Sequence, residues 1–542
     1  MPTHEVTNQP PPLAGHDVAD DPALLTALRA FGAGWAEPEL RDLGRRAGSG
    51  EVIEMARAVH EHPPVLRTHD RYGHRVDEVE FHPYWHALMT VAVGHGLHAA
   101  AWRTPRPGAH AARTAKFFVW SQAEPGHLCP ISMTYAAIPA LRHRQDLADR
   151  FEPLLASKEY DPALRDPQTK RGLIAGMSMT EKQGGSDVRA NTTTARPEAD
   201  GSYRIVGHKW FTSAPMSDLF LILAQAPGGL SCFLVPRVLP GGERNPIRLQ
   251  RLKDKLGNRS NASAEVEYED VHGWLVGDEG RGVRTIMDMV SATRLDAMTG
   301  SAAGMRWGAV QAVHHALHRR AFGSLLADQP LMRNVLADLV IESEAATLLC
   351  MRLAAATDGA ASGDDAEGAF RRIGLPVGKY WICKRAPLHA AEALECVGGN
   401  GYVEESHMPR LYREAPVNSI WEGSGNVAAL DVLRAVATRP ESVDAYFDEV
   451  QRAAGEDSRL DQAAEDLRKE MADTGDAAFR ARRVAERMAL VLQASLLVRF
   501  GNPAVTDAFC ASRLERGHGG AFGTLAPGVD APRVIAQAHV SR

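Results

Sequence analysis

The sequence predicts an α+β multidomain protein with a helical N-terminal domain, a central antiparallel β domain, a helical bundle and an extra C-terminal helical domain. Its 542 residues allow roughly three or four domains. A hydrophobic content of 44% is enough to give each domain a core. The pattern changes from helical periodicity to short β-type runs and back again along the chain, which is typical of such an organisation.

Composition excludes several classes of protein. The chain has 61 Lys and Arg against 67 Asp and Glu, a formal net charge of −6, so it is not coated with basic residues. No apolar run approaches the roughly 18 residues of a membrane-spanning helix. The start has three consecutive prolines and no apolar segment typical of a signal peptide. Six scattered cysteines favour reduced thiols and a cytoplasmic protein.

The N-terminal part divides into two expected segments. We expect residues 1–20 to be a loose tail and residues 21–170 to form a helical domain, because Ala- and Leu-rich segments recur there. The stretch 69–85 interrupts the helical pattern, since apolar residues alternate there with charges. This stretch is expected to be a short exposed hairpin.

Residues 171–285 predict the antiparallel β domain. Short β-type runs separated by turn residues are YRIVGHKWFTS, LFLILAQ, SCFLVPR and AEVEYEDV. In the last run, Val266 and Tyr268 alternate with glutamates, which indicates one buried and one wet face. No helical run lies between these strands, and no G-x-G-x-x-G follows one, which disfavours Rossmann-type dinucleotide binding.

Helical periodicity returns in the remaining two regions. Residues 286–440 predict a helical bundle broken by an Ala, Gly and Asp-rich loop at 358–368. Residues 441–542 predict a separate helical module that loosens at the glycine-rich stretch 517–520.

Three short segments carry the functional argument: MTEKQGGSDV (179–188), GHKWFTS (207–213) and IWEGSGN (420–426). The turn at Gly184–Ser186 offers backbone N–H groups to a phosphate or a polar ring edge, or is an ordinary glycine turn. Glu422 is either a general base for a weakly acidic proton or a carboxylate at the start of a helix.

The order and combination of these segments resemble the acyl-CoA dehydrogenase family. Further matches to its motifs are GDEGRG (277–282), RRAFG (319–323), GGNGY (398–402) and WEGS (421–424). The resemblance implies an FAD-dependent oxidoreductase, a homotetramer and the domain order described above. It also implies that Glu422 is the catalytic base that removes the α-proton of an acyl-CoA.

The resemblance further implies the residues that hold FAD. Trp210 would pack on the flavin ring and Thr212 would lie near its N5 atom, while Arg319, Phe322 and the 398–401 loop would reach the FAD of a neighbouring subunit. The complete set of implied FAD-binding residues is Met179, Thr180, Gly185, Ser186, Trp210, Thr212, Ser213, Arg319, Phe322, Gly398, Gly399, Gly401, Ser424 and Asn426.

Three positions depart from the family pattern. Trp421 replaces the usual Tyr before the base, Ser424 replaces Thr, and Glu395 stands where many relatives have Gln. We therefore expect weak dehydrogenase activity, since the larger indole narrows the pocket.

Essentially the whole chain beyond the N-terminal tail also resembles one branch of the family, the flavoproteins of the adaptive response to DNA alkylation. The matching segments are MTEKQGGSDV, RLKDKLGNRSNAS (251–263), PRLYRE (409–414) and NSIWEGSGN (418–426), together with the extra C-terminal domain. This resemblance implies binding to double-stranded DNA without strong sequence preference, protection from alkylation and weak activity on isovaleryl-CoA. A metabolic short or branched-chain acyl-CoA dehydrogenase with a C-terminal assembly domain is the alternative.

The C-terminal module separates its charges. Residues 441–479 carry twelve acidic and four basic residues, whereas residues 480–516 carry seven arginines and three acidic residues. Clustered arginines suit phosphate contact, or else they flank a helix and pair with the preceding acids. The candidate DNA-binding residues are Arg434, Arg480, Arg483, Arg487, Arg513 and Arg516, with Arg434 taken from the resemblance.

Two histidine pairs have the spacing of metal ligands. His314 and His318 are four residues apart, as are His82 and His86. Neither pair has a third ligand at an obvious spacing, so no metal site is expected.

Overall fold

The computed structural model describes residues 3–473, 475–515 and 520–540. The chain divides into two compact units. Unit 1 comprises Met1–Ile53, Pro107–Ala123 and Ala297–Arg542, and unit 2 comprises Glu54–Arg106 and Glu124–Asp296. The expected helical domain of residues 21–170 is thus shared between the units, because helical periodicity does not reveal which core a helix joins.

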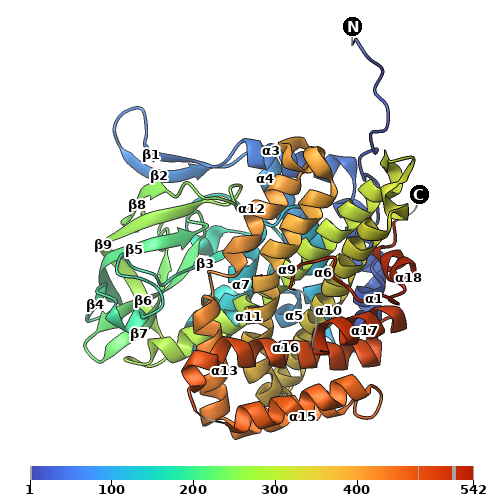
Figure 1. Ribbon diagram of the computed structural model, residues 1–542. Coiled ribbons are helices and arrows are strands. Elements are labelled where there is room, and N and C mark those ends of the chain that lie inside the picture. The colour runs from blue at the N-terminus through green and yellow to red at the C-terminus, as the bar shows by residue number, and fades with distance from the viewer. Residues whose placement is uncertain (1–2, 474, 516–519, 541–542) are drawn as a thin grey trace. The chain divides into compact units, whose positions relative to one another are not determined.

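Unit 2 contains the β domain, drawn in green in Figure 1. Its strands are β3 (Ala175–Ser178), β4 (Thr194–Pro197), β5 (Tyr203–Ser213), β6 (Leu219–Ala226), β7 (Gly229–Pro236), β8 (Ile247–Leu252) and β9 (Ser263–Val276). The strand order is β3-β6-β4-β5-β9-β7, with β8 paired to β9. Because β6 also pairs with β7, strands β4, β5, β6, β7 and β9 form a closed circuit. All pairings are antiparallel except β3–β6 and β4–β6.

Alternation along β9 follows the predicted pattern. Val266 is 1% exposed and Tyr268 is 3% exposed, and both join the core of the β domain with Ile205, Phe233 and Val271. The glutamate between them, Glu267, faces solvent. Burial of every second residue therefore fixes the register of this strand.

A hairpin and short helices complete unit 2. Strands β1 (Val65–His69) and β2 (Arg75–Glu80) pair antiparallel and form the hairpin expected near residues 69–85. The helices are α4 (Pro83–Gly94), α5 (Ala100–Arg103), α7 (Leu128–Leu141) and α8 (Gln145–Leu155).

Unit 1 is helical. The helices that precede the C-terminal module are α1 (Pro22–Ala30), α2 (Glu37–Ala47), α6 (Ala109–Ala123), α10 (Pro330–Ala361), α11 (Asp365–Cys396), α12 (Met408–Asn418) and α13 (Gly425–Thr438). Two further helices cross the unit boundary, α3 (Gly50–Glu61) and α9 (Gly282–His318).

The expected loop at 358–368 is much shorter than predicted. Helix α10 continues to Ala361 and α11 begins at Asp365, so only three residues connect them. The side chain of Asp364 accepts hydrogen bonds from the N–H groups of Ala366 and Glu367 and caps α11. Acidic residues that predict a loop by composition serve here as helix-capping residues.

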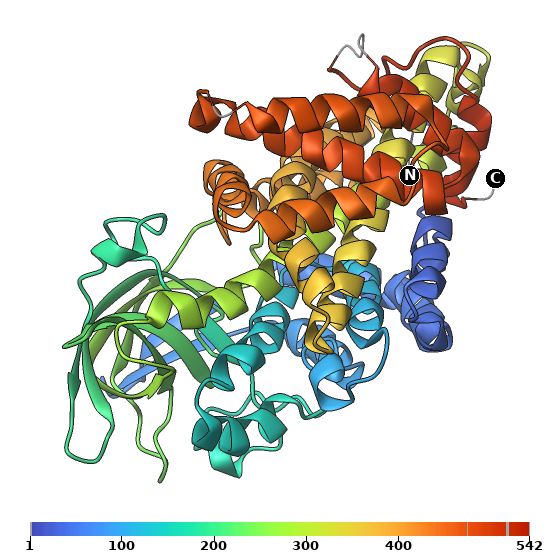
Figure 2. The same ribbon diagram turned by 90° about the horizontal axis from the view of Figure 1, so that it is seen from below.

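The C-terminal helices join the core of unit 1 instead of forming a separate module. They are α14 (Pro440–Gln451), α15 (Ser458–Ala472), α16 (Ala477–Phe500), α17 (Pro503–Phe509) and α18 (Ala531–Ile535). Helices α14 and α16 contact α11, and α16 also contacts α10 (Figures 1 and 2). Arg352 of α10, 4% exposed, forms ion pairs with Glu449 of α14 and Glu367 of α11. The sequence could not show this because it does not specify the partner of an apolar helix face.

The N-terminal segment is held in place, in contrast to the expected loose tail. Its backbone pairs with the end of α2, where Gly15 N–H donates to the Gly48 carbonyl at 2.7 Å. Asn8 exchanges two 2.9 Å hydrogen bonds with the backbone of Arg320. Polar residues and prolines predict weak packing, but these bonds to distant residues order the segment.

Among the helices of the described residues, none is long and apolar enough to cross a membrane.

Candidate active site

Residues 179–188 of unit 2 are expected to hold the flavin ring, and we call them the flavin-ring loop. A buried ion pair anchors this loop. Lys209 of β5 donates to the Glu181 carboxylate at 2.8 Å, and both side chains are fully buried. Lys209 also donates to the Leu223 carbonyl at 2.7 Å. Burial opposes ionisation of Glu181, but hydrogen bonds from Lys209, Thr192 and Thr193 outweigh it and lower the pKa of Glu181 to about 2. Glu181 is therefore an ionised anchor for the residues on either side of it.

This anchor brings the loop and the end of β5 together. The Trp210 N–H donates to the Thr180 carbonyl at 2.8 Å, and Asn191 donates to the Met179 carbonyl at 2.9 Å. Gly185 packs directly against the Thr180 side chain, where a Cβ atom would collide with it. Gly185 and Ser186 remain exposed, so their polar groups are open to a ligand.

Trp210 and Thr212 lie in different environments. The Lys253 ammonium lies 3.4 Å from the centre of one face of the Trp210 indole, a cation–π contact. Thr212 is 2% exposed, and its hydroxyl lies 2.6 Å from that of Ser178. The hydroxyl of Ser213 lies 3.2 Å from that of Ser263. Exposed donors beside a half-buried aromatic ring fit a planar, polar-edged group such as a flavin.

Glu422 lies in a strained turn of unit 1 between α12 and α13. Its φ is +58°, a left-handed conformation that is rare outside glycine, and the next residue, Gly423, has φ +98°. Trp421 fixes one side of the turn by donating from its indole to Asn418 at 3.0 Å. On the other side, the buried Lys379 donates to the Gly423 carbonyl. We call residues 421–424 the base turn.

The second residue after the base turn, Asn426, contacts the C-terminal helices. Arg482 of α16 donates from Nε to the Asn426 side-chain oxygen at 2.8 Å. Ser424 is the N-cap residue of α13, but its side chain makes no capping hydrogen bond.

Two exposed loops of unit 1 contain the other implied FAD residues. Phe322 is 99% exposed at the tip of the hairpin formed by β10 (Arg320–Ala321) and β11 (Ser324–Leu325), and its φ is +52°. Arg319 donates to the Asn8 carbonyl. In the second loop Gly398 and Gly399 are exposed, whereas Gly401 is buried against the Leu394 carbonyl.

The candidate DNA-binding arginines are largely paired with acids of the same chain. Arg483 and Arg487 of α16 both pair with Glu470 of α15, at 2.7 Å and 2.6 Å. Arg480 pairs with Asp473 at 3.3 Å. These contacts match the alternative in which the basic flank neutralises the acidic segment before it.

The remaining candidates differ in accessibility. Arg434 is 71% exposed and lies 3.7 Å from Asp431. Arg513 is 3% exposed and pairs with Asp338 and Glu342 of α10, so its prediction as a phosphate contact is wrong. Sequence could not reveal this, because the buried acids come from a distant helix. Arg516 lies outside the described residues.

The histidine pairs make hydrogen bonds with nearby groups. The His314 ring lies 2.8 Å from the Pro11 carbonyl, and the His86 ring lies 3.0 Å from the Tyr160 hydroxyl. Within the described residues, no group of three or more metal-binding side chains is close enough to hold an ion.

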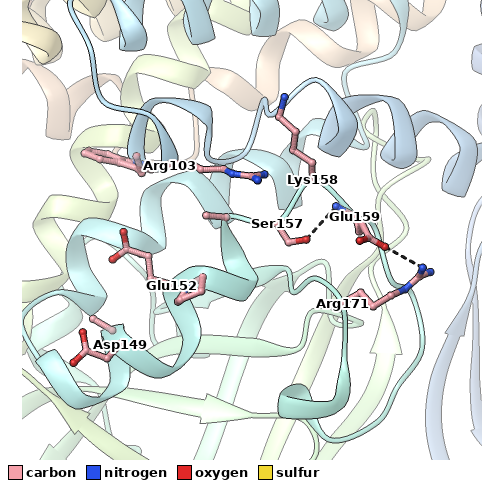
Figure 3. A pocket seen from close by; sticks show the side chains of 11 residues that line it. Arg103, Asp149, Glu152, Ser157, Lys158, Glu159 and Arg171 are labelled. Atoms are coloured by element: carbon pink, nitrogen blue, oxygen red, sulfur yellow. Dashed lines mark hydrogen bonds and ion pairs between the residues drawn. The ribbon is translucent and has the colours of Figure 1, made fainter.

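A surface pocket in unit 2 is lined by none of the predicted flavin residues. It has a volume of about 780 Å³, and its wall includes Trp102, Arg103 and Lys158 (Figure 3). Glu159 and Arg171 at its rim form an ion pair of 2.9 Å. None of the residues that line the pocket therefore belongs to the flavin-ring loop.

Several site residues were not found from the sequence. Glu181 and Lys209 lie inside two of the quoted motifs, so the motifs contained the signal, but their pairing needs the fold. Lys379 gave no signal, since it is one lysine in a long helical run.

Comparisons with known proteins identify the family of the chain. Three family models match the chain: the adaptive response protein AidB N-terminal domain over residues 8–162, the acyl-CoA dehydrogenase middle domain over 176–271 and the acyl-CoA dehydrogenase C-terminal domain over 280–437. Together they follow the predicted domain order.

Individual relatives extend the similarity into the C-terminal helices. The AidB protein of Escherichia coli (strain K12) is 46% identical over 95% of this chain and 95% of its own length. Acyl-CoA dehydrogenase family member 11 of Caenorhabditis elegans is 30% identical over 91% of this chain and 85% of its own.

Solved structures show the same fold. The Caenorhabditis elegans ACDH-11 structure in complex with C11-CoA has a TM-score of 0.87 at 27% identity, covering 99% of this chain and 97% of that one. A Bacillus anthracis acyl-CoA dehydrogenase complexed with FAD has a TM-score of 0.64 at 18% identity, covering 85% of each chain. The chain therefore belongs to the acyl-CoA dehydrogenase family of FAD-dependent oxidoreductases, and within that family it is similar to AidB.

Proposed function

We propose that this protein oxidises the acyl group of a coenzyme A thioester, with Glu422 as the base. The observation that carries this proposal is the left-handed backbone of Glu422 in the base turn. Such a conformation costs about 1–3 kcal/mol at a non-glycine residue and persists where the surrounding structure enforces it, typically at functional sites. Asp476 at the start of α16 also has a left-handed backbone, with φ +50°, so the strain supports the role of Glu422 in combination with the family to which the chain belongs.

The reaction requires removal of the weakly acidic proton next to the thioester carbonyl. A fixed carboxylate can take this proton when it lies within hydrogen-bond reach of it. Bound FAD supplies the acceptor for the two electrons that leave with the β-hydrogen. Exposed Gly185 and Ser186 and the half-buried Trp210 are the residues of unit 2 that would hold and orient it.

We propose a short branched acyl chain, of the isovaleryl type, as the substrate class. Trp421 occupies more volume beside the base than a tyrosine would. Its indole N–H is held by Asn418, so the ring does not swing away easily. The C11-CoA bound by the ACDH-11 relative supports the thioester class but leaves chain length to experiment.

An anaerobic titration tests the proposal. The purified yellow protein is mixed with isovaleryl-CoA, and bleaching of the flavin absorbance is followed. Wild type should bleach, and Glu422→Gln should bleach at least about a hundredfold more slowly while keeping its FAD, since a positioned base typically contributes that much. Glu456→Gln, at an exposed glutamate in the turn between α14 and α15, is the matched control. A colourless protein, or equal rates in all three, would exclude the proposal.

We further propose that the FAD sites are completed in a homotetramer. Phe322 is 99% exposed and Tyr402 is 83% exposed, and both lie in loops that the resemblance assigns to a neighbouring subunit's FAD. Large apolar side chains this exposed commonly mark an interface. Light scattering should give the mass of four chains, and Phe322→Asp should lower both the mass and the bound FAD.

Contact with double-stranded DNA, and protection of that DNA from alkylation, is a second candidate function. The observation that favours it is the exposure of Arg434 and Arg483, 71% and 68%, in a chain matched by the adaptive response protein AidB N-terminal domain. The ion pairs with Glu470 and Asp473 favour the alternative of an assembly role for these helices. Five of the six free cysteines are buried, which supports a cytoplasmic protein under either candidate.

Salt dependence distinguishes these two roles. Affinity for duplex DNA should fall steeply as the salt concentration rises. The double variant Arg434→Gln with Arg483→Gln should reduce the slope of log affinity against log salt concentration by about two, because it removes two charges. Glu470→Gln should strengthen binding because it releases Arg483 and Arg487. Arg45→Gln, at an exposed position of α2, is the control. If none of these changes alters retention, the C-terminal helices serve assembly.

A further inference from the structure

One buried lysine lies directly behind the base turn. Lys379 is in α11 and is 1% exposed. Its ammonium donates to the carbonyl of Gly423, the residue that follows Glu422. A buried ammonium carries a desolvation cost of several kcal/mol that an apolar side chain of similar length would avoid. The presence of a charge at this point therefore needs an explanation beyond packing.

The base turn needs an external constraint. Both Glu422 and Gly423 have positive φ values, +58° and +98°, and Ser424 gives α13 no side-chain cap. Trp421 is tied to the end of α12, by its indole to Asn418 and by its backbone N–H to the Val417 carbonyl. Lys379 comes from a different helix, so its bond relates the turn to the core of unit 1.

We propose that Lys379 is a positioning residue for the dehydrogenase reaction. By holding the Gly423 carbonyl it keeps the left-handed backbone that aims the Glu422 carboxylate at its substrate. The inference rests on the proposed function of Glu422 and adds a residue that acts only through it. A hydrogen bond to a charged donor is strong enough for this role, typically about twice as strong as one between neutral groups.

A kinetic comparison tests the proposal. Lys379→Met keeps the length and apolar stem but removes the ammonium, and Lys469→Met changes an exposed lysine of α15 as a control. Anaerobic mixing with isovaleryl-CoA should show flavin reduction about ten- to a hundredfold slower in Lys379→Met, with the dissociation constant within about twofold of wild type. Lys469→Met should behave as wild type.

A double variant shows whether Lys379 acts through Glu422. In the Glu422→Gln background, Lys379→Met should cause no further loss, because residues that act as a unit are not additive. The same fold loss in both backgrounds would overturn the proposal, as would a rate within twofold of wild type. If a lower FAD content or a lower thermal midpoint accounted for the whole loss of rate, the proposal would also be overturned, since Lys379 would then serve stability alone.

Hydrogen exchange gives a readout independent of turnover. Amides of residues 422–425 should exchange faster in Lys379→Met than in wild type and be unchanged in Lys469→Met. Unchanged exchange in both variants would overturn the positioning role. If wild type failed to bleach with acyl-CoA while Lys379→Met still loosened this turn, the proposed function would be wrong and the contact would stand as purely structural.

Discussion

At the scale of single residues, the flavin-ring loop depends on the ion pair between Glu181 and Lys209. Removing one partner of a buried pair leaves the other charge uncompensated, at a cost of roughly 3–5 kcal/mol. Lys209→Met should therefore lower the thermal midpoint and the FAD content together. Absorbance of the purified variant and a thermal melt measure both, with the exposed Lys158→Met as control. Normal FAD content in Lys209→Met would show that the loop is held by other contacts.

The ion pair between Glu181 and Lys209 also sets a lower pH limit for full stability of the fold. The pKa of Glu181 is lowered from 4.5 to about 2 on folding, so its stabilising contribution is complete above about 4.5 and is lost as the pH falls toward 2. Glu342 and Glu449, both paired with arginines, have pKa values of about 2 for the same reason. Protonation of these three carboxylates should therefore lower the stability of the fold progressively as the pH falls from about 4.5 toward 2.

At the scale of elements, the N-terminal segment orders the β10–β11 hairpin. Asn8 bonds to both backbone groups of Arg320, and its own carbonyl accepts from Arg319. Asn8→Ala should therefore speed hydrogen exchange in residues 319–325 by about thirtyfold, since it loses two hydrogen bonds worth about 1 kcal/mol each. Thr7→Ala, at an exposed neighbouring position, should leave that exchange unchanged. Equal exchange in the two variants would mean that the hairpin is ordered without the segment.

A second element-scale feature is the junction of α10 with α17. Glu344 of α10 accepts from the Asn502 N–H at 3.0 Å, and burial raises its pKa to about 7. Because the folded pKa exceeds the unfolded value, its stabilising contribution is complete below about 4.5 and is lost as the pH rises through about 7. Glu344→Gln should thus raise the thermal midpoint at pH 8 and change it little at pH 5. The reverse order of effects would contradict this assignment.

At the scale of the whole molecule, the C-terminal helices are part of the core of unit 1. Arg352 joins α10, α11 and α14 through Glu367 and Glu449, and Arg499 of α16 adds a 2.7 Å pair to Glu449. A chain ending at residue 440 should be insoluble or should bind hydrophobic dyes, because it exposes the faces of α10 and α11 that these helices cover. Recovery of a soluble, flavin-containing truncated protein would contradict this prediction.

Sequence and structure contributed different parts of this description. We could predict the order of domains and the β9 alternation, and recognise the motifs around Thr180, Trp210 and Glu422, because periodicity and short motifs are local properties of the chain. The buried state of Arg513, the Glu470 pairs of Arg483 and Arg487, and the ordering of Asn8 were not, because each depends on residues far away in sequence.

The sequence by itself determined which residues could do flavin and acid–base chemistry, and in which order they occur. Only the tertiary structure decided which partner each buried charge has. Lys209 pairs with Glu181, Lys379 donates to the turn that carries Glu422, and Arg352 pairs with the C-terminal helices. The physical reason is that a charge is buried only where a partner meets it, and such meetings are set by how distant helices and strands pack.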